Sequence, residues 1–374
     1  MQNNDNSNNK MLSEIGSNFW INPNEELKDL PLGTPEQFGC KGNDYVWLST
    51  GRSAISFAIK AIEERNPQLK KSAILPPFTC HTVIEPFLNA GYEVHHYLIN
   101  EKLETSADLI LQCVKDNDAS IVLFHRYFGF NTVKDSDLLC QELRRQNKYT
   151  IEDCTQCLYD GASKSEADYH VGSIRKWQGT PDGGFAVCRD GVFHNKPEQT
   201  DVPLEQAKIK ASFAKYKFLF DHEGDKPTFL QLYREAEDIL IAQEDFRAIS
   251  ATSQKMQSNL DVSFLRNRRR KNFQTLLSGL ANSKNVSPMF DHLGVAIVPL
   301  YFPMLTKDRA SLQAHLRQYD IYAPVVWPKA DCLGEVCEEV EYLYQHLLCI
   351  PIDQRYDADD MNRVVETINN YNKI

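Results

Sequence analysis

The first half of the chain alternates short apolar runs with helix-like stretches. Runs of strand length occur at 46–48, 73–75, 93–98, 120–124, 149–151 and 184–188, and helical spacing occurs at 54–62, 82–90, 108–114 and 135–145. Strands that alternate with helices pair in parallel, because each helix carries the chain back across the sheet. We therefore predict a largely parallel sheet that is covered by helices on both faces.

The second half of the chain predicts a separate, smaller unit. Residues 204–258 are polar and helix-prone, and the basic run 266–271 is most simply a solvated helix face. Beyond it we expect strands at 295–300 and 321–326, an apolar segment at 347–352, and helices at 307–318, 336–345 and 358–370. A chain of 374 residues favours two domains. We place an N-terminal tail and arm at 1–40, a large domain at 41–258 and a small domain at 259–374.

Composition excludes several classes of protein. The net charge of −10 disfavours general nucleic-acid binding. No apolar run reaches the roughly 18 residues that a membrane span needs, and the polar residues 1–10 resemble a disordered tail rather than a signal peptide. The ten cysteines lack the spacing of a disulfide framework, so we expect reduced thiols in a cytoplasmic protein.

One lysine and one aspartate carry the chemistry that the sequence indicates. Lys176 is followed by a turn and a glycine pair, and Asp153 ends an apolar run 23 positions earlier. A lysine amine bonds covalently to pyridoxal phosphate, and a carboxylate keeps the pyridine nitrogen of that cofactor protonated, so that the ring accepts electrons. Loop lysines are usually solvated, but Arg175 beside Lys176 favours the neutral amine that this bond needs. We therefore predict a pyridoxal phosphate site with Lys176 and Asp153 as its catalytic residues.

A phosphate site is predicted where the first helix of the sheet begins. Gly51 permits a tight turn there, and the main-chain amides of Arg52 and Ser53 open the helix at the positive end of its dipole. Ser173 is a further candidate phosphate ligand. The alternative is an ordinary Ser/Thr helix cap.

The segment after Asp153 permits two interpretations. Gln156 lies three residues beyond Asp153, within reach of the phenolic oxygen of the cofactor. The spacing Cys154-x-x-Cys157 is also typical of redox chemistry or of half a metal site. No second half of a metal site is nearby, and the acids before Cys154 raise a thiol pKa, so we predict no metal. The stretch 125–129 after a buried strand either edges the pocket or plugs the strand end.

Taken together and in order, these segments resemble the DegT-like sugar aminotransferases. The motifs that carry the resemblance are Thr50–Ala54, Pro76–His81, His125–Gly129, Glu152–Gln156 and Ser173–Gly184, with 321–328, 348–352 and 357–368 in the second half. Three positions depart from the family pattern. Arg52 replaces a small polar residue, Cys80 replaces an aromatic residue that stacks on the cofactor, and Ser173 precedes the lysine by three residues instead of five.

The resemblance implies an aspartate aminotransferase-like fold, with a large α/β/α domain around a mostly parallel mixed sheet and a smaller C-terminal α/β domain. It implies pyridoxal phosphate as cofactor, with Phe78, Cys80 and His81 in the segment that covers the cofactor ring. It implies transfer of an amino group from glutamate to a nucleotide-linked keto-sugar, in a homodimer with shared active sites. Two alternatives stay open: another pyridoxal phosphate reaction on a small amino acid or keto acid, and a non-catalytic protein of the same fold.

Overall fold

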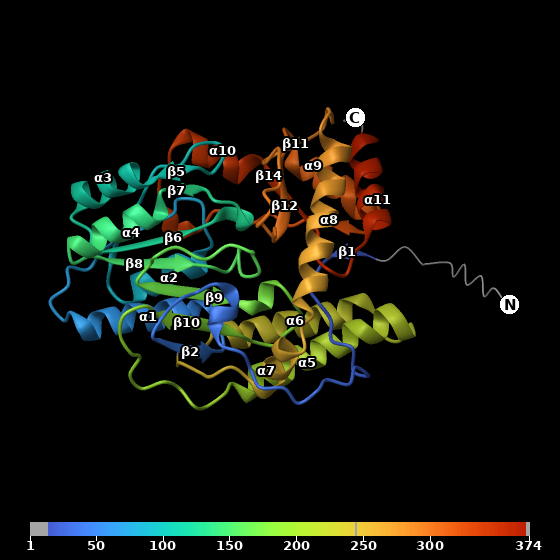
Figure 1. The fold of residues 1–374 in the computed structure, drawn as a ribbon. Coiled ribbons are helices and arrows are strands. Elements are labelled where there is room, and N and C mark those ends of the chain that lie inside the picture. Colours follow the sequence, from blue (N-terminus) through green and yellow to red (C-terminus); the bar gives the residue numbers. More distant parts are fainter. Residues whose placement is uncertain (1–13, 244, 372–374) are drawn as a thin grey trace.

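The computed structural model describes residues 14–243 and 245–371. Its largest sheet contains β2 (Asp44–Leu48), β3 (Ser72–Leu75), β4 (Glu93–His96), β6 (Ile121–His125), β8 (Tyr149–Asp153), β9 (Tyr169–Ser173) and β10 (Gly184–Cys188). The strand order is β2-β10-β9-β8-β6-β3-β4, and Figure 1 labels β2, β10, β9, β8 and β6. Strand β10 pairs antiparallel with both of its neighbours, and the other pairs are parallel. The largely parallel sheet predicted from the sequence is confirmed.

Four helices connect the parallel strands of this sheet. They are α1 (Gly51–Arg65), α2 (His81–Asn89), α3 (Ala107–Asn117) and α4 (Ser136–Arg145). Every residue of β3, β6, β9 and β10 is buried, as expected for strands that are covered on both faces. Strand β9 was not predicted, because its segment Tyr-His-Val-Gly-Ser contains no apolar run. Two short strands, β5 (Thr105–Ser106) and β7 (Val133–Lys134), pair outside the main sheet.

A helical hairpin follows the large sheet. It consists of α5 (Val202–Tyr216), a π-helical turn (Lys217–Asp221) and α6 (Lys226–Ile241), and α7 (Ala251–Ser258) comes after it. Helices α5 and α6 pack along each other, and Figure 1 shows them below the C-terminal elements. The helix-prone character predicted for this region is confirmed.

The C-terminal region has its own small sheet, with the strand order β11-β12-β14. Its elements are α8 (Val262–Leu280), β11 (Ser287–Pro288), β12 (Tyr301–Leu305), α9 (Arg309–Gln318), β13 (Ile321–Tyr322), α10 (Glu338–His346), β14 (Leu347–Pro351) and α11 (Ala358–Asn369). The strand expected at 295–300 is wrong, because this segment is a loop. Val295 is 94% exposed at its tip, and the carbonyl of Ala296 and the N–H of Val298 bond to Gly161 and Asp160 instead of to a strand.

The N-terminal arm crosses to the C-terminal region. Strand β1 (Ile15–Gly16) pairs in parallel with β13, and the buried carboxylate of Glu14 forms ion pairs with Lys215 and Lys226 at 2.7 and 3.0 Å. The arm is therefore fastened to both the hairpin and the small sheet. The tail at 1–10 lies outside the described residues, and the boundaries proposed at 40 and 258 stay a prediction. Within the described ranges, no helix is both long and apolar enough to cross a membrane.

Candidate active site

The predicted site residues converge at the carboxyl edge of the large sheet. Asp153 is the last residue of β8, and Ser173 is the last residue of β9, its parallel neighbour. Lys176 ends a single 3-10 turn (Ile174–Lys176) that follows β9 directly. Helix α1 begins at the same place, since a Cβ added to Gly51 would lie 3.1 Å from the Cβ of Ser173. Carboxyl ends of parallel strands are where open α/β sheets bind ligands.

Thr155 connects the parts of this edge, although no sequence motif singles it out. Its N–H donates to Oδ1 of Asp153 at 2.9 Å, and its hydroxyl accepts from the N–H of Ser173 at 3.1 Å. Its carbonyl accepts from Nε1 of Trp177 at 2.7 Å. Thr155 thereby fixes the spacing between the aspartate and the lysine loop.

Lys176 and Asp153 lie within electrostatic range of each other. The amine of Lys176 is exposed to a cavity, but protein surrounds that cavity, so burial lowers the pKa of Lys176, and the charge of Arg175 lowers it further. Burial raises the pKa of Asp153, while the Thr155 hydrogen bond and Lys176 lower it. A lysine with a depressed pKa is neutral more often at physiological pH, and a buried carboxylate gains most from a cationic partner.

The turn at the start of α1 is a helix cap that lies next to Ser173. The hydroxyl of Thr50 accepts from the N–H of Ser53 at 2.9 Å, and their hydroxyls lie 2.8 Å apart. The cap interpretation is therefore confirmed. It leaves the helix start at Gly51 next to Ser173. Arg52 turns its guanidinium away to Glu85, at 3.1 Å, and to the carbonyl of Leu240, so only its main chain faces the predicted phosphate site.

The segment expected to cover a cofactor ring divides into two parts. Phe78 is fully buried among aromatic rings, with centroids 4.6 Å from Tyr344 and 5.6 Å from Trp327. It therefore packs as a core residue. Cys80 precedes the first residue of α2 without a side-chain capping bond, accepts from the hydroxyl of Thr82 and lies within electrostatic range of Lys176. His81 is exposed as the first residue of α2.

His125 and Gln156 each leave a buried nitrogen without a hydrogen-bond partner in the described part of the chain. These atoms are Nε2 of His125 and Nε2 of Gln156. Burial lowers the pKa of His125 to about 3, and its ring stacks on Trp327 at 5.5 Å. The carbonyl oxygen of Gln156 accepts from the N–H of Phe128 at 2.6 Å. Because buried polar groups are nearly always paired, such orphaned nitrogens indicate a missing partner.

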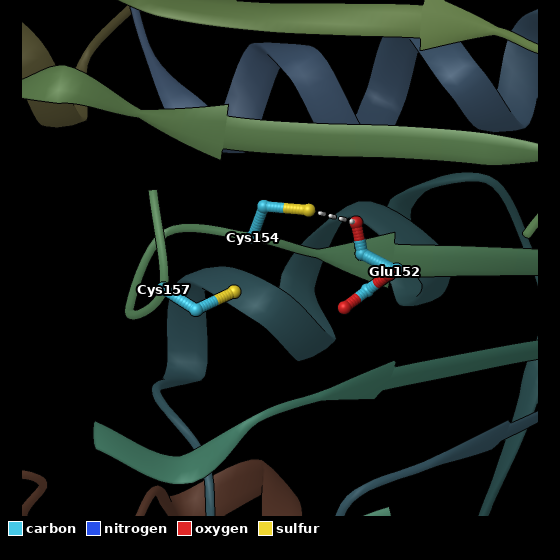
Figure 2. Close-up of side chains that lie close together, drawn as sticks. All are labelled: Glu152, Cys154 and Cys157. Atoms are coloured by element: carbon cyan, nitrogen blue, oxygen red, sulfur yellow. Dashed lines mark hydrogen bonds between the residues drawn. The ribbon is translucent and has the colours of Figure 1, made fainter. Parts of the chain in front are cut away.

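Figure 2 shows the side chains of Glu152, Cys154 and Cys157 grouped around the end of β8. Their ligand atoms all lie within 4.8 Å of one another, but the carboxylate is already committed to Arg126 at 3.0 Å and to Ser165 at 2.6 Å. Burial raises the pKa of Cys154 well above its ordinary value, and the neighbouring thiol of Cys154 together with burial does so for Cys157. The arrangement is therefore poor for a metal or for a reactive thiolate. All ten cysteines are free.

A cavity of about 590 Å³ opens beside Lys176. The N-terminal arm, the lysine loop, the α5–α6 hairpin and the C-terminal region all contribute to its wall. Its charged lining residues are six cations and two acids, namely Arg175, Lys176, Lys208, Arg234, Arg269 and Arg355 against Glu237 and Asp353. A strongly cationic cavity in a chain of net charge −10 attracts anions by focusing the local field.

Arg269 corrects the expectation of a solvated basic face at 266–271. Its guanidinium is buried, donates to the carbonyl of Leu300 at 2.9 Å and lies 4.5 Å from the ring of Trp177. Burial lowers the pKa of Arg269 to about 10, while Asp353 raises it. Arg355 forms an ion pair with Asp353 at 2.7 Å on the same wall. The basic sequence 266–271 alone does not show that Arg269 is buried while its neighbours are more exposed.

This protein is similar to known proteins in structure but not detectably in sequence. No family model and no curated protein matches the sequence. Solved structures do match. PseC from Helicobacter pylori, an aminotransferase involved in pseudoaminic acid biosynthesis, is 12% identical over 95% of this chain and 98% of its own, with a TM-score of 0.66. The chain has the fold of an aminotransferase.

Two further structures of this fold were solved with cofactor-derived groups. DesV from S. venezuelae, in complex with a ketimine intermediate, is 17% identical over 91% of this chain and 89% of its own, with a TM-score of 0.62. NtdA from Bacillus subtilis, with bound cofactor PMP, is 15% identical over 87% and 72%, with a TM-score of 0.60. The expected aspartate aminotransferase-like architecture is therefore confirmed.

Proposed function

We propose that the protein is a pyridoxal phosphate-dependent aminotransferase. The observation that carries this proposal is the placement of Lys176, a lysine of depressed pKa, beside the buried Asp153 at the carboxyl edge of a parallel sheet. The similarity of the fold to DesV and NtdA supports it.

The residues present fit the cofactor. The N–H groups at the start of α1 and the hydroxyl of Ser173 would hold its phosphate. Asp153 would pair with the protonated pyridine nitrogen, and this pairing would offset the free-energy cost of burying the carboxylate. The orphaned Nε2 of Gln156 would find an oxygen acceptor. When bound, pyridoxal phosphate supplies a ring that accepts the electrons released at the α-carbon of an amino acid.

Lys176 acts as the proton carrier of the reaction. Its Nζ takes the proton from the α-carbon of the amino donor and returns a proton on the product side, which requires an amine that is neutral part of the time. Arg175 maintains that state by its charge. Thr155 holds Asp153 and the loop of Lys176 at a constant spacing.

We also propose the two substrates and the oligomeric state. The donor is an amino acid, with glutamate as the first candidate, and the acceptor is a keto-sugar linked to a nucleotide. The cationic wall of the cavity suits the charges of both. PseC, an aminotransferase, shares the fold over 95% of this chain and 98% of its own. We further propose a homodimer with shared active sites in the cytoplasm, where ten free thiols stay reduced.

The test is a set of half-reactions on the purified protein. After addition of pyridoxal phosphate the protein should develop a visible absorption band, and glutamate should convert the band to that of the aminated cofactor. A panel of nucleotide-linked keto-sugars and small keto acids should then restore it. Restoration only by small keto acids would favour the alternative pyridoxal phosphate reaction. A protein that stays colourless refutes the proposal and favours the non-catalytic alternative.

A further inference from the structure

The α5–α6 hairpin brings one carboxylate into the middle of the cavity cations. Oε2 of Glu237, on α6, lies 2.5 Å from Nζ of Lys208 on α5 and 3.7 Å from the guanidinium of Arg175. All three side chains line the cavity beside Lys176. A single carboxylate oxygen thus lies between a primary ammonium and a guanidinium.

The burial of the partners is unequal. The side chain of Lys208 is 11% exposed, whereas that of Glu237 is 48% exposed. Burial lowers the pKa of Lys208, and Glu237 raises it again. The lysine therefore depends on a nearby anion, but the half-exposed glutamate already keeps part of its hydration and regains the rest when it moves away. Lys208 and Arg175 are therefore the less exposed members of the cluster, and the carboxylate of Glu237 is the member that another anion can most easily displace.

We propose that Lys208 and Arg175 form a subsite for a substrate carboxylate, and that Glu237 occupies this subsite until the substrate displaces it. The group already bound there is a carboxylate, so the spacing of the two cations suits a carboxylate of the amino-acid donor. Glu237 then sets specificity, because a ligand must supply an anion to replace the one it removes. The inference rests on the proposed function and names the chemical class of its substrate.

Glu237 also acts on Lys176. Its charge raises the pKa of Lys176, against the effects of burial and of Arg175. Displacement of Glu237 by an incoming carboxylate exchanges one negative charge for another near the amine. The protonation of Lys176 is thereby kept similar in the free and the occupied cavity.

Calorimetry with glutarate tests the subsite, because glutarate has two carboxylates but no amino group to transfer. A failure of the subsite proposal can therefore be told apart from a failure of the proposed function. We suggest about pH 6.5, where lysine stays protonated and glutarate is ionised, at low ionic strength, with the purified full-length chain. Glu237→Gln should bind glutarate roughly fivefold more tightly than the natural protein, because the internal competitor is gone, and Lys208→Met should bind it at least about tenfold more weakly.

The matched control is Glu235→Gln, which makes the same change on α6 at an exposed residue outside the cavity wall. It should leave glutarate affinity unchanged. Equal affinities for Glu237→Gln and Glu235→Gln would overturn the proposal, as would full binding by Lys208→Met or an absence of binding in every variant. Inorganic phosphate is the second probe. If phosphate binding depends on Glu237 and glutarate binding does not, the assignment to a carboxylate is wrong.

Discussion

The site at the sheet edge and the wall of the cavity are built differently. The edge consists of strand ends, where Asp153, Ser173 and Lys176 follow directly from β8 and β9. The wall is drawn from distant segments and includes residues of three helices, Lys208, Glu237 and Arg269. In the proposed function, the polar groups of the edge hold the cofactor and the charges of the wall select the substrate. Substitutions at the edge should therefore abolish the chemistry, whereas substitutions in the wall should alter affinity, stability and pH dependence.

The largest effect is expected for Lys176→Ala. Loss of the proton carrier should lower the rate of amino transfer by roughly a thousandfold or more, since general acid–base groups contribute about 10²–10⁴. Steady-state kinetics with the best donor and acceptor measures this. The control is Lys210→Ala, an exposed lysine on α5, which should keep the natural rate. Comparable rates for the two variants would remove Lys176 from the mechanism.

Asp153→Asn should lower amino transfer by about a hundredfold, because a neutral amide does not stabilise a protonated pyridine nitrogen (about 2.7 kcal/mol). Its partner experiment is Asp168→Asn. Asp168 is also buried, but it binds the N–H and hydroxyl of Thr150 toward the other end of β8. That variant should lose stability and retain the turnover of the folded fraction. If Asp153→Asn turned over as fast as Asp168→Asn, the carboxyl edge would not be the site.

Arg269→Met should lower the free energy of unfolding by about 2 kcal/mol, since it leaves buried carbonyl groups such as that of Leu300 without a donor. Urea unfolding measures the difference. Arg268→Met, at the adjacent and less buried position, should change stability by less than about 0.5 kcal/mol. Equal losses would restore the interpretation of 266–271 as a uniform solvated face.

The smallest effects are opposite shifts in the pH dependence of cofactor binding. Arg175 lowers the pKa of Lys176 and Glu237 raises it. Arg175→Gln should therefore move the formation of the visible band to higher pH, and Glu237→Gln should move it to lower pH, each by roughly half a unit. Spectrophotometric titration with pyridoxal phosphate measures both. Shifts in the same direction would contradict the assigned signs.

Much of the fold was predictable because alternating apolar runs determine a parallel sheet. The positions of Asp153, Ser173 and Lys176 were predictable too, since parallel strands place their carboxyl ends at one edge. Strand β9 was not, because its burial arises from the sheet around it rather than from an apolar run. Arg269 and Lys208 resemble solvated charges in sequence, and only the packing of α8 and α5 buries them. The outward turn of Arg52 depends equally on a distant carboxylate, Glu85.

The most direct measurement is a peptide map of the natural protein after treatment with pyridoxal phosphate and borohydride, which fixes the cofactor to the amine that bound it. Among the residues that the structure describes, two lysines line the cavity, Lys176 and Lys208. We expect one stoichiometric modification, on the peptide that contains Lys176, because its amine is accessible and Lys208 is paired with Glu237. Modification of Lys208, or scattered labelling of surface lysines without Lys176, would contradict the central claim.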